Sequence, residues 1–173
     1  TEYMYPEVGK AATRILEALG YNVILEGQKK CCGRPLISKG QLAKARDWAA
    51  TNVGALAPHA RKGTLIVGTE PSCLLTLRDE YPDLLRDDAS KEVASQAVML
   101  DELLAQLAKD EPDAVKAIFR EHELPPLQVH GHCHQKALIG TDPTMEALAI
   151  AGIDAELIDS PCCGMAGTFG FET

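Results

Sequence analysis

Residues 18–33 read ALGYNVILEGQKKCCG, and residues 150–164 read IAGIDAELIDSPCCG. Each stretch leaves a predicted helix through a glycine, passes through a short predicted strand and reaches a Cys-Cys-Gly triplet. Two copies of one pattern so far apart in the chain indicate a structural repeat. The sequence therefore predicts a tandem pseudo-repeat, with half-repeats at about residues 1–123 and 124–173.

Helices and strands are expected to alternate along the rest of the chain. The spacing of apolar residues predicts helices at 7–19, 40–61, 73–81, 91–108, 113–122 and 144–151. Short β-rich runs predict strands at 21–25, 64–68, 127–130 (as a buried strand) and 155–159. This order favours an α/β fold, built from βα units around a largely parallel sheet. Ligands of such sheets collect beyond the carboxyl ends of the strands, and a metal site is expected there.

Six cysteines are too few for a disulfide scaffold and too patterned for core filling. Thiolates are the preferred ligands of iron–sulfur clusters and other soft metals. The predicted metal ligands form one group in each copy: Cys31, Cys32 and Cys73, and then Cys133, Cys162 and Cys163. Gly33 and Gly164 are expected to permit a bend beside each doublet and to let backbone amides approach the sulfurs.

Histidines and basic residues near the cysteines are further candidates. His132 and His134 flank Cys133, and an extended backbone there would place them on one face and Cys133 on the other. They are candidate metal ligands, especially for zinc, and hydrogen-bonded surface histidines are the alternative. Arg34 and Lys136 follow the cysteines closely, where positive charge would favour thiolates and an anionic cluster or carboxylate. Solvated surface charge is the alternative for both.

Composition excludes several classes of function. The chain has 173 residues, enough for one domain, and a net charge of −8 from 17 basic and 25 acidic residues. This charge disfavours nucleic-acid binding, and no apolar run approaches the roughly 20 residues of a membrane helix. No signal peptide is recognisable, so a cytoplasmic location is expected. The repeat phasing predicts that the sequence is a piece of a longer chain.

Five stretches carry a resemblance to a known family. They are residues 6–10 (PEVGK), 31–36 (CCGRPL), 70–73 (EPSC), 130–136 (HGHCHQK) and 162–170 (CCGMAGTFG). They resemble the cysteine-rich (CCG) domain family, which includes lactate-utilisation proteins, heterodisulfide reductase and iron–sulfur subunits of glycolate oxidase and anaerobic glycerol-3-phosphate dehydrogenase. The similarity is greatest to the C-terminal iron–sulfur domain of FAD-linked oxidases of the D-2-hydroxyacid dehydrogenase type. One departure is that the family's Cys-x-x-Cys reads Cys73-Leu74-Leu75-Thr76 here.

The resemblance implies an electron-transfer domain with a cluster of the 4Fe–4S type. It would relay electrons between a flavin and an acceptor in a 2-hydroxyacid oxidoreductase. The sequence has no Gly-x-Gly-x-x-Gly and no P-loop, so the FAD is expected in another domain or subunit. No residue is assigned a catalytic role, and the isolated chain is expected to be inactive. Two alternatives are a zinc-binding structural module and a thiol–disulfide catalytic site.

Overall fold

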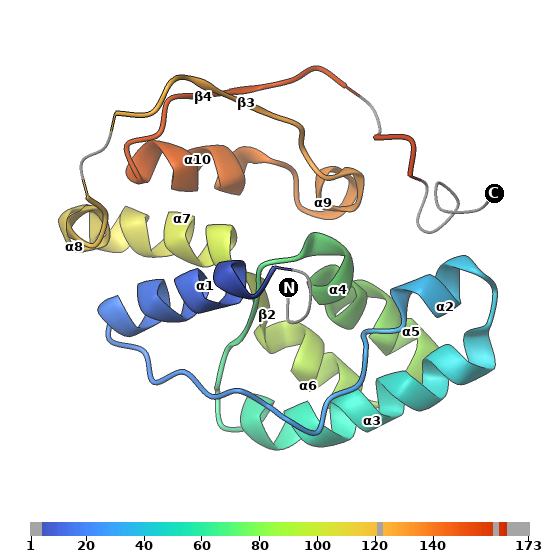
Figure 1. Cartoon of the computed structure of the whole chain (residues 1–173). Coiled ribbons are helices and arrows are strands. Elements are labelled where there is room, and N and C mark those ends of the chain that lie inside the picture. Colours follow the sequence, from blue (N-terminus) through green and yellow to red (C-terminus); the bar gives the residue numbers. More distant parts are fainter. Residues whose placement is uncertain (1–4, 121–122, 161–162, 166–173) are drawn as a thin grey trace. The chain divides into compact units, whose positions relative to one another are not determined.

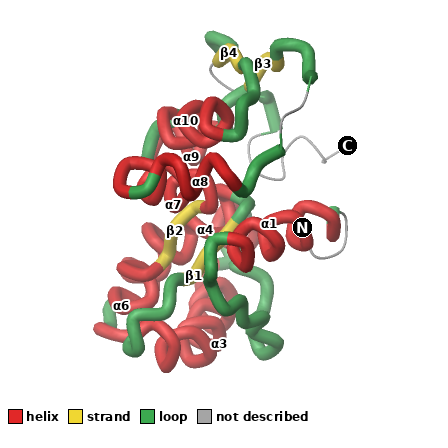
Figure 2. The backbone as a smooth tube through the Cα atoms, turned by 90° about the vertical axis from the view of Figure 1, so that its left-hand side faces the viewer, coloured by secondary structure: helices red, strands yellow, loops and turns green. Residues whose placement is uncertain are grey.

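The computed structural model describes residues 5–120, 123–160 and 163–165. They divide into two compact units, one of residues 5–24 and 99–160 and the other of residues 25–98 and 163–165. Helices predominate in both units, and strands are few and short (Figure 2). Within the described ranges, no helix combines the length and the apolar character needed to cross a membrane.

The first unit is mainly helical, with one pair of strands. Its elements are α1 (Pro6–Ala18), α7 (Leu100–Asp110), α8 (Pro112–Ala117), β3 (Leu127–Val129), α9 (Cys133–Leu138), α10 (Asp142–Ile150) and β4 (Ala155–Leu157). Its core joins Leu104 of α7, Val115 of α8 and Ala147 of α10, and Ile15 and Leu19 pack against this cluster. The apolar faces of four helices are thereby buried together.

The two strands of this unit run side by side beside α10 (Figure 1). They pair in parallel, with Leu127 opposite Ala155 and Val129 opposite Leu157. Gly152, between α10 and β4, has φ of 76°. Glycine adopts this left-handed conformation at the end of a helix with little strain. The predicted strands at 127–130 and 155–159 are thus confirmed in shorter form. The expected burial of the first is wrong, because Leu127 and Gln128 are exposed.

The second unit is built around the longest helix, α3. Its elements are α2 (Arg34–Ser38), α3 (Leu42–Ala60), β1 (Ile66–Gly68), α4 (Pro71–Leu75), the π-helical turn η1 (Thr76–Glu80), α5 (Tyr81–Leu85) and α6 (Asp88–Gln96). Ala49, Val53 and Ala57 recur along one face of α3 and pack against Tyr81 and Val93. The predicted helices at 40–61 and 73–81 and the strand at 64–68 are confirmed, apart from their bounds.

The strand predicted at 21–25 is wrong. These residues form an irregular segment, in which Leu25 is 85% exposed. A run of β-formers gains little from extension unless a neighbouring strand pairs with it and one face is buried. The first doublet therefore does not follow a strand, whereas Cys73 does follow β1.

The helix predicted at 91–108 is interrupted. The chain extends at β2 (Ala97–Met99), which pairs with β1, and α7 begins directly afterwards. Glu102 accepts a hydrogen bond from the Met99 backbone N–H at 3.0 Å, which starts the new helix. The helix predicted at 113–122 ends at Ala117 as α8, and residues 121–122 lie outside the described ranges.

The α/β class is confirmed in the broad sense that helices are combined with short strands, and parallel pairing is confirmed for β3 and β4. Among the described residues, the strands form two separate two-stranded sheets, β1–β2 and β3–β4, in place of one larger sheet. Gly20 and Gly152 both take positive φ after a helix, but a strand follows only in the second copy. The tandem pseudo-repeat and a metal site at strand ends are therefore not confirmed.

Candidate metal centre

The first doublet sits where the irregular segment meets α2. Cys31 is exposed, and Cys32 is buried with 8% of its surface accessible. Gly33 follows with φ of 84° and caps the N-terminus of α2. Gly164 has φ of 83° after the second doublet. Side chains rarely adopt this conformation, so glycine is the residue that allows the turn at both places.

Cys73 is brought to the same unit by β1 and α4. The side chain of Glu70 caps α4 by accepting a hydrogen bond from the Cys73 backbone N–H at 2.6 Å. Gly68, at the end of β1, allows α4 to approach closely, because an added Cβ would lie 2.9 Å from Leu74 Cβ. The start of α4 is thus fixed by a cap on one side and by a close backbone approach on the other.

The thiols of Cys31 and Cys73 both interact with the thiol of Cys32. The Cys73 thiol, the Arg34 backbone N–H and the Cys31 thiol hydrogen-bond to the Cys32 sulfur, and together they outweigh burial and lower the pKa of Cys32 to about 7. The hydrogen bond between the Cys73 and Cys32 thiols, together with burial, raises the pKa of Cys73. Partial desolvation of the Cys31 thiol raises the pKa of Cys31. The structure therefore brings Cys31, Cys32 and Cys73 together, with Cys32 as the most acidic thiol.

Charged groups border the thiols on both sides. Hydrogen bonds from Cys73 and Ser72 outweigh burial and lower the pKa of Glu70, which keeps this carboxylate ionised beside Cys73. The Arg34 guanidinium forms an ion pair with Glu80. Arg34 thus supports the doublet through its backbone N–H, which hydrogen-bonds to the Cys32 sulfur, while its side chain is engaged by a carboxylate.

The spacing of the three thiols bears on the kind of metal group that they could hold. A tetrahedral zinc ion with Zn–S bonds of about 2.3 Å draws its ligand atoms to within about 4 Å of one another. Across the described ranges, no three cysteines have sulfurs that all lie within 4.8 Å of one another. Iron–sulfur clusters spread thiolate ligands over several irons, so three neighbouring thiols fit that group.

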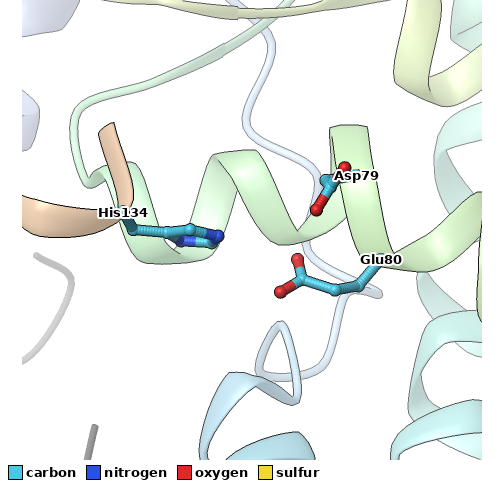
Figure 3. A group of neighbouring side chains, drawn as sticks. All are labelled: Asp79, Glu80 and His134. Atoms are coloured by element: carbon cyan, nitrogen blue, oxygen red, sulfur yellow. The ribbon is translucent and has the colours of Figure 1, made fainter. Parts of the chain in front are cut away.

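An acidic pair, Asp79 and Glu80, lies on η1, as Figure 3 shows. The third side chain drawn there, His134, lies on α9 and belongs to the other unit.

The second predicted group is spread over both units. Cys133 is exposed and begins α9 in the first unit, and Cys163 is exposed and belongs to the second. Cys162 lies outside the described residues. The extended backbone expected at 132–134 is wrong, because His132 caps α9 by accepting a hydrogen bond from the His134 N–H at 3.2 Å. Metal binding by this group and by these histidines stays a prediction.

Lys136 has a role within the first unit. Its Nζ donates a hydrogen bond to the Ser160 backbone carbonyl at 2.6 Å, and His130 Nε2 lies 3.2 Å from Ser160 Oγ. Gly131 makes room for this side chain, because an added Cβ would lie 2.6 Å from Lys136 Cε. Lys136 thus ties α9 to the chain two residues before Cys162, and a direct contact with a cofactor stays a prediction.

Sequence reasoning missed Asn52 and Tyr81, which lie buried behind the first doublet. Asn52 Nδ2 donates to the Tyr81 hydroxyl at 2.7 Å, and this hydroxyl donates to the Cys32 carbonyl at 2.9 Å. Burial, reinforced by the charges of the thiols, raises the pKa of Tyr81 and keeps its hydroxyl protonated. A polar residue on the core face of α3, between Ala49 and Val53, is the signal that could have found Asn52. No comparable signal marks Tyr81.

Comparison with known proteins supports the resemblance. Residues 1–78 match the CCG family, described as a cysteine-rich domain. A subunit of anaerobic glycerol-3-phosphate dehydrogenase from Escherichia coli K12 is 35% identical over 175 residues, covering 98% of this chain and 42% of the relative.

Lactate utilization protein A from Geobacillus kaustophilus is 28% identical over 180 residues, covering 99% of this chain and 71% of the relative. The corresponding Bacillus velezensis protein is 26% identical over 174 residues, covering 95% and 68%. No solved structure matches. The chain spans about two fifths of the dehydrogenase subunit, and its residues 1–78 match the cysteine-rich CCG domain family.

Proposed function

We propose that this chain is an iron–sulfur electron-transfer domain of a flavin-dependent 2-hydroxyacid oxidoreductase. The observation that carries the proposal is the meeting of Cys31, Cys32 and Cys73 in one unit. One of the relatives is by name a dehydrogenase subunit, and others are lactate utilization proteins. Lactate is a 2-hydroxyacid, which supports this substrate class.

The chain's own residues would hold and tune such a cluster. Cys31, Cys32 and Cys73 would supply thiolates, and a 4Fe–4S cluster bound there would pass single electrons between the flavin and an acceptor. The Arg34 backbone N–H already hydrogen-bonds to the Cys32 sulfur, and such bonds stabilise the more reduced, more negative state. Cys133, Cys162 and Cys163 are proposed as a second set of ligands, with His132 and His134 as further candidates. The partners would be a flavin domain or subunit and an electron acceptor.

Anaerobic reconstitution of the full chain with iron and sulfide tests this proposal. We expect broad visible absorption and an EPR signal on reduction. Cys73→Ser is expected to remove most of the iron bound through the first group, whereas Ser95→Ala, an exposed serine on α6, is expected to leave iron content unchanged. Failure of the full chain to take up iron and sulfide would refute the proposal, and stoichiometric zinc without iron would favour the zinc-binding module.

The contact between the Cys32 and Cys73 sulfurs supports a second candidate, thiol–disulfide exchange. The Cys32 thiolate would attack a substrate disulfide and release one thiol. Cys73 would then attack the mixed disulfide and release the second thiol, so that the substrate is reduced and a Cys32–Cys73 disulfide is formed. Incubation of the metal-free chain with oxidised glutathione, followed by peptide mass spectrometry, would reveal that disulfide. Its absence would exclude this candidate.

A further inference from the structure

A closed hydrogen-bond network lies directly behind the first doublet. Asn52 projects from α3 and Tyr81 from the first turn of α5, and their exposed fractions are 3% and 0%. Asn52 Nδ2 donates to the Tyr81 hydroxyl at 2.7 Å. Two polar side chains thus lie in the core of the second unit, where Tyr81 packs with Ala49, Val53 and Val93. Polar groups are costly in such a core unless every hydrogen bond is made.

The remaining hydrogen bonds of this pair all go to three consecutive residues. Asn52 Oδ1 accepts from the Lys30 backbone N–H at 2.6 Å, and Asn52 Nδ2 donates to the Cys31 carbonyl at 3.2 Å. The Tyr81 hydroxyl donates to the Cys32 carbonyl at 2.9 Å. The pair therefore binds the main chain of residue 30, residue 31 and residue 32 in turn.

This stretch of main chain lies outside regular secondary structure. Residues 21–33 form no helix or strand, so their backbone groups need partners from elsewhere in the unit. Helices α3 and α5 contact each other through the core and provide a rigid base for the two side chains. Two rigid helices thereby fix the backbone from which the Cys31 and Cys32 sulfurs project.

We infer that Asn52 and Tyr81 are positioning residues, which hold the Cys31–Cys32 backbone in the conformation that presents the Cys32 sulfur to Cys73. The consequence for metal binding rests on the proposed iron–sulfur function. The positioning itself does not, because the network consists entirely of the chain's own side chains and main chain. Loosening it should expose Cys32 locally while the rest of the unit stays folded.

Tyr81→Phe tests the inference, because it removes one hydroxyl and keeps the ring in the core. In the metal-free full chain, the rate of Cys32 alkylation by iodoacetamide, measured by peptide mass spectrometry, is expected to rise about tenfold, which corresponds to about 1.4 kcal/mol. Val93→Ala is the matched control, because it weakens the same core without touching the doublet. Both variants are compared with the wild type at a urea concentration far below their unfolding transitions.

The outcomes separate a positioning role from a general loss of stability. Faster Cys32 alkylation in Tyr81→Phe than in Val93→Ala supports the inference, and equal rates in the two variants overturn it. A second readout is the reduction potential of the reconstituted chain, which is expected to shift in Tyr81→Phe and not in Val93→Ala. If the wild type takes up no iron, the proposed function fails, and the alkylation rates still decide the role of Tyr81.

Discussion

Gly68 offers a sharp test of how Cys73 is held. A methyl group added there would lie 2.9 Å from Leu74 Cβ and 3.0 Å from Leu74 Cδ1. Rotation of the leucine side chain can relieve the second contact but not the first, because Cβ is fixed to the main chain. In Gly68→Ala, α4 must therefore move away from β1, and Cys73 moves with it.

The size of the effect follows from the burial of this contact. Leu74 and Leu75 are buried, so the displaced helix cannot move freely toward solvent. Overpacking of a well-packed core costs about 1–3 kcal/mol, and we expect Gly68→Ala to lower the free energy of unfolding by this amount. Gly54→Ala is the control, and it is expected to change the free energy of unfolding in the opposite direction. Gly54 lies exposed within α3 with no atom near its added Cβ, so alanine should stabilise the helix by up to about 1 kcal/mol.

Urea denaturation followed by circular dichroism measures both variants. Iron content after anaerobic reconstitution then reports on Cys73 separately, and it is expected to fall in Gly68→Ala and to stay at the wild-type level in Gly54→Ala. If Gly68→Ala were as stable as Gly54→Ala, the close approach of α4 to β1 would not be what positions Cys73. That result would refute the reasoning whatever the iron content.

Three further changes probe the supports of both units, each measured by urea denaturation. Lys136→Met keeps the apolar stem but loses the hydrogen bond to the Ser160 carbonyl. It should lower the free energy of unfolding by about 1.5 kcal/mol. An unchanged free energy of unfolding would show that this bond is not formed in solution. Asp101→Ala removes the acceptor shared by Gln135, a buried donor of α9, and Thr144, a half-buried donor of α10, and should lower the free energy of unfolding by about 1–3 kcal/mol. Asp87 caps α6, and hydrogen bonds from Ser90 lower the pKa of its carboxyl group. The cap therefore stabilises the fold fully above the unfolded-state pKa, which is near 3.9. This stabilisation is lost as the pH falls through the lower folded-state pKa. Asp87→Ala should therefore cost about 1 kcal/mol at pH 7, and the difference from wild type should vanish in strong acid.

The sequence is sufficient to predict which of the rare cysteines lie together in the second unit. The repeat and the strand before Cys73 predict Cys31, Cys32 and Cys73 as one group, and the structure brings them together. The apolar stripe of residues 40–61 likewise predicts α3, because a helix that buries one face leaves a regular pattern.

Other parts depend on contacts that local patterns do not contain. The run at 21–25 has the composition of a strand, but no partner strand pairs with it in the described part of the chain. The break at 97–99 depends on pairing with β1, some 30 residues earlier in the sequence, so helical periodicity alone could not reveal it. Tyr81 is an ordinary aromatic residue in sequence, and its importance arises only from what its hydroxyl reaches.

The boundary of the family match and the boundaries of the structural units also differ, with a physical consequence. The match covers residues 1–78, which include the first three cysteines but not Tyr81 or α6. It also includes α1. Ile15 of this helix and Leu19, directly after it, pack in the core of the other unit. A fragment of residues 1–78 would therefore keep the thiols and lose both the hydroxyl that holds the Cys32 carbonyl and the helix that closes the core around Val93. The thiols alone do not define the candidate centre, because Tyr81, one of the two side chains that hold their main chain, lies beyond the matched segment.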